Sequence, residues 1–381
     1  MIYKLKLILI AFCVLAIFNC SMPVFAAEIS VSAKAAVVIN ADTKEILYSK
    51  NAHSKLSMAS TTKIMTALLL AEQNTPQKWL VTTDEMVSVE GSSMGLKAGD
   101  TVTYYSLLVG MLLASGNDAA NTTAFALAGS IEKFALMMNN RAKQIGMENT
   151  NFVTPSGLDD ENHYSTAFDM ALLAAEALKN ETFKEVASST KITTRYGNPP
   201  YNRTLSNHNR LLNEYEYCIG VKTGFTKKSG RCLVSAAEKD GCRVIAVTLN
   251  DPDDWQDHKN LLSLGLSKVT LKDITYNFNN DSISVVGGNK DSLKITTESV
   301  FYSKTENSNT NITTKVNMLP FVYAEAKEGL VVGSVKYYFG DVLINEKPIT
   351  IVGDSKYLSF KSKSFKDRLK NSFILIFKQF L

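Results

Sequence analysis

Residues 218–249 read CIGVKTGFTKKSGRCLVSAAEKDGCRVIAVTL, and this stretch decides the fold. Short apolar runs at 219–221, 231–236 and 244–249 lie in it, and the last two are joined by the turn-forming residues 238–241. Runs of this length, rich in β-branched residues and bounded by turns, are typical of strands. The sequence therefore predicts three successive strands here.

Two further strands are predicted near the start of the chain, at 35–40 (AAVVIN) and 46–49. Between these early strands and the late ones, apolar residues recur at helical spacing, so we expect a helical insertion. The first and last strands can then pair into one antiparallel sheet, with a cleft where the sheet meets the helical subdomain. The predicted helices cover 61–72, 104–114, 118–128, 131–145, 168–178 and 257–266, with Asp118, Ser130 and Thr166 as N-caps.

From about residue 271 the sequence pattern changes to short runs of alternating polar and apolar residues, such as 335–339 and 342–344, with Gly, Asn and Lys between them. This pattern is typical of a small all-β domain. It holds no histidine and no reactive cluster, so a spacer role is favoured. The fold class is thus α/β (α+β), followed by a small β-rich domain.

The first residues carry Lys4 and Lys6, then an apolar run at 7–18, then small residues up to Ala26. This is the pattern of a secretory signal, with cleavage expected after Ala26. A membrane-spanning helix is disfavoured because the run falls short of the ~20 apolar residues that a bilayer needs. A lipoprotein signal at Cys20 is a further alternative.

The last residues, 361–381, hold six basic residues and one acidic residue. Apolar residues recur at three- and four-residue steps from Phe365 to Phe380, and the basic residues lie mostly off that stripe. A basic amphipathic helix of this kind suits the headgroup layer of a membrane, although it can also dock on the protein itself. The expected boundaries are 1–26 for the signal, 27–270 for the α/β domain, 271–360 for the β-rich domain and 361–381 for the membrane-anchor helix.

Composition narrows the class of partner. A formal charge of +4 on 381 residues is too small to indicate nucleic acid as a partner. Without the signal, Cys218, Cys232 and Cys242 remain, an odd number. A hairpin centred on 238–241 would put Cys242 opposite Ala237 and not opposite Cys232, so we expect free, partly buried thiols. The four histidines are scattered, so neither a metal site nor another cofactor is expected.

Three short motifs occur in order: Ser60-Thr61-Thr62-Lys63, Ser115-Gly116-Asn117 and Lys222-Thr223-Gly224. The first opens a predicted buried helix, where free backbone N–H groups and the helix dipole favour negative charge. Lys63 follows Ser60 on the same face, so its amine can reach the hydroxyl. A serine needs a base to become a nucleophile, and a lysine can serve if burial and a nearby positive charge, such as that of Lys222, keep it neutral. Taken alone, Ser60 can equally be a simple N-cap.

Together the motifs resemble the penicillin-binding-protein and serine β-lactamase superfamily. The runs SMASTTKIMTALL (57–69), LLASGNDAA (112–120), GLDDENHYSTAFDMA (157–171), NRLL (209–212) and GVKTGFTKKSGRCLVSAA (220–237) resemble the low-molecular-mass D-alanyl-D-alanine carboxypeptidases. The likeness covers about 35–266, and the β-rich segment and basic terminal helix match that family's layout.

The resemblance implies a function and a set of roles. An acyl-enzyme on Ser60 would remove the terminal D-alanine from peptidoglycan stem peptides, and β-lactams would acylate the same serine as inhibitors. The family's location would be the outer face of the cytoplasmic membrane. The resemblance implies that Ser60 is the nucleophile, Lys63 its general base and Ser115 a proton relay. Asn117 would support Lys63 and the substrate amide, and the N–H groups of Ser60 and Phe225 would form the oxyanion hole. The residues implied to bind the substrate carboxylate are Lys222, Thr223 and Thr226. Gly224 would keep the strand edge clear for the substrate.

One departure concerns the substrate carboxylate. Some family members place an arginine after the Lys-Thr-Gly strand, whereas residues 251–258 read DPDDWQDH here. Arg243 is an alternative but its position on a strand favours a structural role. His163, His208 and Asp169 are likewise interpreted as structural.

Three alternatives share these motifs. A serine β-lactamase of class A would need a deacylating glutamate, and no Glu-x-x-Leu-Asn run lies between Asn117 and Lys222. A catalytically silent wall-binding protein would be expected to lose Ser60, Lys63 or Lys222. An endopeptidase acting on cross-links cannot be separated by motifs alone.

Overall fold

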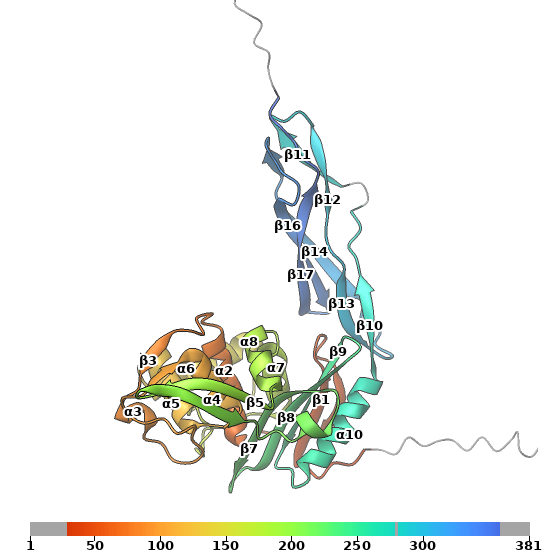
Figure 1. The fold of residues 1–381 in the computed structure, drawn as a ribbon. Coiled ribbons are helices and arrows are strands. Elements are labelled where there is room, and N and C mark those ends of the chain that lie inside the picture. The colour runs from red at the N-terminus through yellow and green to blue at the C-terminus, as the bar shows by residue number, and fades with distance from the viewer. Residues whose placement is uncertain (1–28, 279–280, 359–381) are drawn as a thin grey trace, which may run out of the picture.

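A five-stranded antiparallel sheet forms the centre of the α/β part, with strand order β2-β1-β9-β8-β7 (Figure 1). β1 pairs with β9, with Val37 opposite Val247, which confirms that the first and last strands meet in one sheet. β7 is the edge strand and carries the Lys-Thr-Gly motif. The strands of this sheet are β1 (Ala35–Asn40), β2 (Ile46–Lys50), β7 (Cys218–Thr226), β8 (Gly230–Lys239) and β9 (Cys242–Leu249).

The central strands are apolar without alternation because both of their faces are covered. In β1, Val37 belongs to the core beneath the helical subdomain, whereas its neighbour Val38 belongs to a second core against α10. β9 alternates in the same way, with Val247 in the first core and Ala246 in the second. Successive strand residues point to opposite faces, so a strand buried on both sides needs apolar residues at every position.

Helices cover the sheet on both sides, and the main predicted helices are confirmed within a few residues at their ends (Figure 1). Ser130 and Thr166 cap their helices through side-chain oxygens, as expected. The 3-10 turn η1 (Ala59–Thr62) precedes the first long helix. The helices are α2 (Lys63–Ala71), α3 (Asp84–Val87), α4 (Tyr104–Leu112), α5 (Asn117–Ala128), α6 (Ile131–Ile145), α7 (Ala167–Ala177), α8 (Glu181–Ser188), α9 (Leu211–Glu214) and α10 (Asp254–Ser267).

A second, four-stranded sheet flanks the helical subdomain and was not predicted. Its order is β3-β4-β5-β6, and the hairpin β5–β6 supplies most of it. The hairpin has largely polar, exposed strands, so it lacks the apolar runs that marked the other strands. Its members are β3 (Trp79–Val81), β4 (Thr101–Thr103), β5 (Lys191–Gly197) and β6 (Pro200–Ser206).

The predicted register of the β8–β9 hairpin is wrong. Cys242 lies opposite Lys239, and Ala237 lies opposite Val244. The turn is therefore the two residues Asp240 and Gly241, both with positive φ, rather than a four-residue loop. The cysteines 218, 232 and 242 are free in the structure.

The C-terminal part is an all-β domain that extends away from the α/β part (Figure 1). Its six-stranded sheet has the order β14-β16-β17-β12-β11-β15, and β10 and β13 form a separate pair. Val335, Tyr337 and Ile349 lie at the centre of its own apolar core. Its strands are β10 (Val269–Ile274), β11 (Ser282–Val286), β12 (Ser292–Thr296), β13 (Val300–Thr305), β14 (Ile312–Met318), β15 (Phe321–Tyr323), β16 (Val331–Phe339) and β17 (Val342–Val352).

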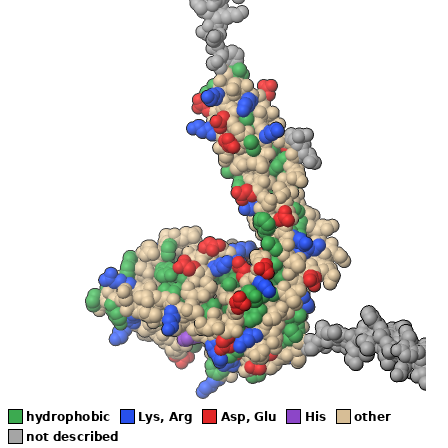
Figure 2. All heavy atoms as spheres, turned by 45° about the vertical axis from the view of Figure 1, so that its right-hand side comes forward, with side chains coloured by type: hydrophobic (Ala, Val, Ile, Leu, Met, Phe, Trp, Pro, Cys, Tyr) green, Lys and Arg blue, Asp and Glu red, His purple; other side chains and the backbone are tan. Residues whose placement is uncertain are grey.

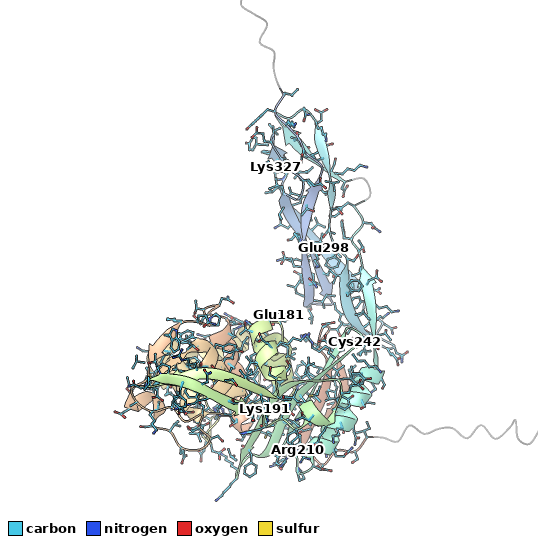
Figure 3. The ribbon with its side chains drawn as sticks, in the orientation of Figure 1. Glu181, Lys191, Arg210, Cys242, Glu298 and Lys327 are labelled. Atoms are coloured by element: carbon cyan, nitrogen blue, oxygen red, sulfur yellow. The ribbon has the colours of Figure 1, made fainter. Side chains whose placement is uncertain are left out.

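Polar contacts join the two parts at the turn between β1 and β2. The side chain of Asn40 donates to the Ser303 carbonyl at 2.7 Å, and the Ser303 amide donates to Asp42 at 2.7 Å. Cys242 lies beside this joint, at the start of β9 (Figure 3). In the space-filling view the narrow β-rich part rises from the broader α/β part, with acidic and basic side chains interspersed on it (Figure 2).

This computed structural model describes residues 29–278 and 281–358. The predicted signal (1–26) and terminal helix (361–381) lie outside the described residues. Within the described ranges, no helix is long and apolar enough to cross a membrane.

Candidate active site

Ser60 lies in the 3-10 turn η1, which runs directly into α2. The sequence predicted a helix from residue 61 with Ser60 before it, but Met58 takes the N-cap position and Ala59 has a left-handed φ of +48°. In a 3-10 turn, residues three apart lie almost directly above one another. Lys63 is three residues after Ser60, and its Nζ lies 3.0 Å from the Ser60 Oγ.

The Lys63 amine has two further partners, both of which can only accept. Nζ lies 2.6 Å from the Oδ1 of Asn117 and 2.7 Å from the Ser156 carbonyl oxygen. The Asn117 amide is oriented by its Nδ2, which donates to the Glu90 carbonyl at 2.6 Å. A neutral amine has two hydrogens and one lone pair, so these two acceptors take both hydrogens. The lone pair is then left facing the Ser60 hydroxyl.

Burial favours the neutral form of that amine. The Lys63 side chain is fully buried, and this lowers its pKa well below the usual value for lysine. The charge of Lys222 lowers the pKa of Lys63 further, whereas Asp118 raises it. Lys222 is also buried, and desolvation lowers its pKa to about 7.

Ser115 and Asn117 are presented by the turn between α4 and α5. Ser115 has a left-handed φ of +57°, a conformation that costs a non-glycine residue about 1 kcal/mol or more. The turn is held by backbone bonds, from Gly116 to Gly110 and from Asn117 to Ser92. Asn117 is thereby the first residue of α5 with its side chain aimed at Lys63.

Asp118 is not the N-cap of α5, contrary to the prediction, because Gly116 occupies that position. Its carboxylate instead accepts backbone N–H groups of Met94, Gly95 and Leu96 at 2.9–3.0 Å. It therefore pins the loop that follows Ser92 beside the site. A carboxylate with this many donors is a positioning group for the loop.

The segment that carries Ser156 approaches the nucleophile because of a glycine. Gly157 has a φ of +85°, and a Cβ there would overlap the Ala59 carbonyl and crowd Thr62. His163 supports the same loop: its Nδ1 accepts from the Val153 amide at 2.9 Å, and its Nε2 bonds the Thr62 hydroxyl at 2.8 Å. Burial lowers the pKa of His163 to about 4.

On the opposite side, the edge strand β7 lies against η1. The structure gives Gly224 a reason beside the predicted one of keeping the strand edge clear for the substrate. A Cβ at Gly224 would come within 3.0 Å of the backbone nitrogens of Ser60 and Thr61, so the glycine is required by the close approach of two backbones. Lys222, two residues earlier, points to the buried side and donates to the Thr223 carbonyl at 2.9 Å.

A cavity of about 300 Å³ opens above these groups. Among the predicted site residues, Ser60, Ser115, Thr223, Gly224 and Phe225 line it, whereas Lys63, Asn117 and Lys222 lie behind its wall. Thr226 does not line it. The Thr226 hydroxyl donates to Asp159 at 2.9 Å and bonds Ser229, so it closes the β7–β8 turn.

The sequence analysis missed part of the lining. His208 was interpreted as structural, yet it borders the cavity, and burial lowers its pKa. No spacing in the sequence connects these residues to the three motifs, because they come from loops, from strand β8 and from the start of helix α10. The missed lining residues are Ser92, His208, Arg231, Asp254 and Trp255.

Within the described ranges, no cluster of His, Cys, Asp and Glu is arranged to hold a metal ion. His258 of α10, for example, is buried with its ring between the hydroxyls of Ser235 on β8 and Thr248 on β9. The groups around the Ser60 hydroxyl are hydroxyl, amine, amide and backbone groups. That set suits nucleophilic acyl transfer with a lysine base.

Both parts of the chain match families of known proteins. Residues 22–253 match the family described as D-alanyl-D-alanine carboxypeptidase, and residues 270–356 match the family described as penicillin-binding protein 5, C-terminal domain. The D-alanyl-D-alanine carboxypeptidase DacF of Bacillus subtilis is 32% identical over 364 residues, covering 90% of this chain and 92% of its own length.

The chain also resembles solved structures in its fold. The carboxypeptidase DacD of Francisella tularensis superposes with a TM-score of 0.62 at 26% identity, covering 89% of this chain and 97% of its own. Penicillin-binding protein 5 of Haemophilus influenzae gives a TM-score of 0.62 at 25% identity, covering 87% and 99%.

Proposed function

The chain belongs to the D-alanyl-D-alanine carboxypeptidase family, and from that premise we propose how the residues around Ser60 carry out its reaction. The protein is a low-molecular-mass penicillin-binding protein and a serine-type hydrolase that acts on peptidoglycan stem peptides. The proposal concerns the roles of individual residues and the place where the enzyme works.

One observation carries the assignment of nucleophile and base. The Lys63 amine has a lowered pKa, gives its hydrogens to Asn117 and Ser156, and lies 3.0 Å from the Ser60 Oγ. A base must be within hydrogen-bond reach and must be able to lose its proton; Lys63 lies within reach, and burial shifts its pKa towards the neutral form. In the reaction, Ser60 Oγ attacks the carbonyl that joins the last two D-alanines as its proton passes to Lys63.

The oxyanion is assigned to the backbone N–H groups of Ser60 and Phe225. The close packing of Gly224 against Ser60 supports this, because it places the next residue of β7 beside the nucleophile. Such donors are typically worth ~100- to 1,000-fold in rate each. The substrate then lies along the free edge of β7, as peptides do when they extend a sheet.

The leaving amine needs a proton. Ser115 lines the cavity and lies two residues before Asn117, which bonds Lys63, so Ser115 is assigned to relay the proton from Lys63 to the leaving D-alanine. Water then cleaves the ester and regenerates Ser60. Thr223 and the ammonium of Lys222 are assigned to the terminal carboxylate. Thr226 is assigned to the turn, since its hydroxyl is already engaged there.

The other activities considered for this site are less well supported. A silent wall-binding protein would not need the intact Ser60–Lys63–Asn117 arrangement. A β-lactamase would not be expected to match the penicillin-binding protein 5 C-terminal domain over 270–356. Cleavage of cross-links by the same site remains the second candidate, since its bond is also next to a D-alanine.

We also propose that the enzyme is exported and works at the outer face of the cytoplasmic membrane. The support is the basic-then-apolar start before Ala26 and the basic amphipathic pattern of 361–381. The β-rich domain then acts as a spacer between the membrane and the catalytic part.

The test of the catalytic proposal is intact mass after brief exposure to penicillin, with wild type beside Ser60→Ala. We expect a stoichiometric adduct on the wild type alone, and D-alanine release from a pentapeptide by the wild type alone. Adduct on both proteins would assign the nucleophile elsewhere. Destruction of penicillin with no adduct and no D-alanine release would favour a lactamase.

A further inference from the structure

A single guanidinium group borders the cavity above Ser60. It belongs to Arg231 on β8, and Thr223, Asp254 and Trp255 line the cavity with it. Of the described residues that line this cavity, only Arg231 has a side chain that stays cationic at any working pH. His208 has a lowered pKa and is neutral there.

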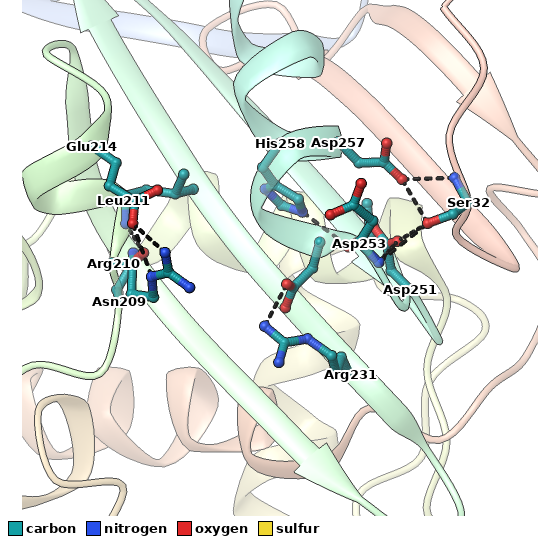
Figure 4. Close-up of polar contacts among 12 residues, drawn as sticks. Ser32, Asn209, Arg210, Leu211, Glu214, Arg231, Asp251, Asp253, Asp257 and His258 are labelled. Carbon is teal, nitrogen blue, oxygen red and sulfur yellow. Dashed lines mark hydrogen bonds and ion pairs between the residues drawn. The ribbon is translucent and has the colours of Figure 1, made fainter.

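Arg231 is held in place on one side only. Its Nη2 forms an ion pair with the Oδ1 of Asp254, the first residue of α10, at 2.6 Å (Figure 4). The guanidinium also lies 5.4 Å from the Trp255 ring centroid. Asp254 is nearly buried, so this carboxylate is a fixed tether. An arginine has five N–H donors, and this ion pair uses one of them.

One of the remaining donors is conspicuously unsatisfied. Among the described residues, the buried Nε of Arg231 has no hydrogen-bond partner. Leaving a buried donor without an acceptor is unfavourable, so this guanidinium is not fully satisfied by its protein partners. Since the side chain is still 41% exposed, the guanidinium is both anchored and accessible to a ligand in the cavity.

The register of the sheet puts Arg231 on the appropriate side of the substrate strand. β7 and β8 are antiparallel, with Phe225 opposite Arg231 and Thr223 opposite Leu233. Residues directly opposite each other on such a pair share a face, and so do residues two apart on one strand. Arg231 therefore lies on the same face of the sheet as Thr223, whose hydroxyl is assigned to the terminal carboxylate.

The other two cations near the site do not carry a permanent positive charge. Lys63 has to be neutral to act as the base. Lys222 is buried, already donates to the Thr223 carbonyl, and has a pKa of about 7, so it loses charge near neutrality. Residues 251–258, which follow β9, contribute carboxylates and no arginine or lysine. A permanent positive charge for the substrate must come from another element.

We propose that Arg231 binds the terminal carboxylate of the peptide beside Thr223, with Asp254 and Trp255 holding its guanidinium, and so selects substrates with a free C-terminus. This deepens the proposed function and rests on it. The carboxylate-binding arginine of this chain thus lies on β8, the strand next to the Lys-Thr-Gly strand. Its ion-pair partner, Asp254, belongs to the acidic stretch after β9, where some family members have an arginine.

The test compares two peptides that differ only at the C-terminus: one ends in D-alanyl-D-alanine with a free carboxylate and the other in the corresponding amide. Release of D-alanine or D-alaninamide gives kcat/KM for each. The ratio of the two values does not depend on how much of a variant is correctly folded. The variants are Arg231→Gln, Arg231→Lys and the control Arg210→Gln.

Arg210 is a matched control because it also lies over the Trp255 ring, at 5.7 Å, but does not line the cavity. Its side chain is exposed and paired with Glu214 (Figure 4). We expect the carboxylate-to-amide ratio of the wild type to fall by roughly 10- to 100-fold in Arg231→Gln. Arg231→Lys should retain part of the preference, and Arg210→Gln should keep all of it.

An unchanged ratio in Arg231→Gln, or an equal fall in Arg210→Gln, would overturn the assignment of Arg231 while leaving the carboxypeptidase itself intact. A wild type that neither releases D-alanine nor forms a penicillin adduct would instead overturn the proposed function, and this inference with it.

Discussion

Gly224 lies so close to Ser60 that a Cβ on the glycine would come within 3.0 Å of the serine's backbone nitrogen. The edge strand and the turn that carries the nucleophile are therefore packed backbone against backbone. This contact joins two motifs separated by more than 150 residues in the sequence. It also brings the substrate-binding edge of the sheet to the reacting hydroxyl.

Gly224→Ala should consequently separate β7 from η1. Overpacking of this kind costs about 1–3 kcal/mol, and we expect penicillin acylation of Ser60 to slow by roughly 10- to 100-fold. Gly340→Ala is the control, since Gly340 has a positive φ of 56° but open space around it. That variant should lose some thermal stability and keep its acylation rate. Normal acylation in Gly224→Ala would show that the close contact is not required.

Lys63→Met should remove the base without a large change in volume. We expect the acylation rate to fall by about 100- to 10,000-fold, the usual contribution of a general base. Stopped-flow or mass-spectrometric acylation rates measure this. Lys227→Met, at an exposed lysine in the turn after β7, is the comparison and should acylate normally. Rapid acylation of the Lys63 variant would require a different base.

The pH profile of kcat/KM should be bell-shaped. On the acid side the rate falls because Lys63 becomes protonated and can no longer accept the serine proton. On the alkaline side it falls as Lys222, with a pKa of about 7, loses the charge that attracts the substrate carboxylate. Lys222→Arg stays charged, so its profile should lack the alkaline fall. A wild-type profile that is flat above neutrality would contradict this role of Lys222.

His258 should make the folded state sensitive to acid. Its burial lowers its pKa to about 3, against ~6.5 in the unfolded chain. Between these values the unfolded chain binds the extra proton, so stability is lost as the pH falls, by about 1.4 kcal/mol per pH unit from this residue. Urea unfolding at several pH values should show that the free energy of unfolding of His258→Gln depends less steeply on pH than that of the wild type. Identical slopes from pH 6 to pH 4 would mean that His258 is protonated in the native state.

Truncation after Phe360 tests the predicted membrane anchor. The shortened protein should be released from anionic vesicles while hydrolysing a soluble peptide as before, because the removed residues 361–381 carry the six basic residues of that end. Sedimentation with vesicles measures the binding. Continued sedimentation of the shortened protein would place the membrane contact in another part of the chain.

Much of the fold was predictable because burial leaves a direct signature in the sequence. Strands covered on both faces, such as β1 and β9, are apolar at most positions, and long amphipathic helices such as α6 repeat at 3.6 residues. The hairpin β5–β6 was missed because its strands are half-exposed and rich in polar residues, so the inward positions, such as Thr194 and Arg203, do not form an apolar alternation in the sequence. The turn between β8 and β9 was misplaced because the apolar runs on its two sides do not specify the register of the hairpin. In the structure the positive φ angles of Asp240 and Gly241 make these two residues the turn and so set the register.

The sequence by itself determined which residue types are available for chemistry: a serine and a lysine three apart, an Asn after a Ser-Gly turn, and a Lys-Thr-Gly run on a strand. Only the tertiary structure decided what they do together. It buries Lys63 against Asn117 and Ser156 so that its lone pair faces Ser60, and it brings Arg231 and Asp254 to the same cavity. The reason is that local spacing constrains neighbours within a turn of helix or strand, whereas contacts between distant segments depend on how the sheet and helices pack.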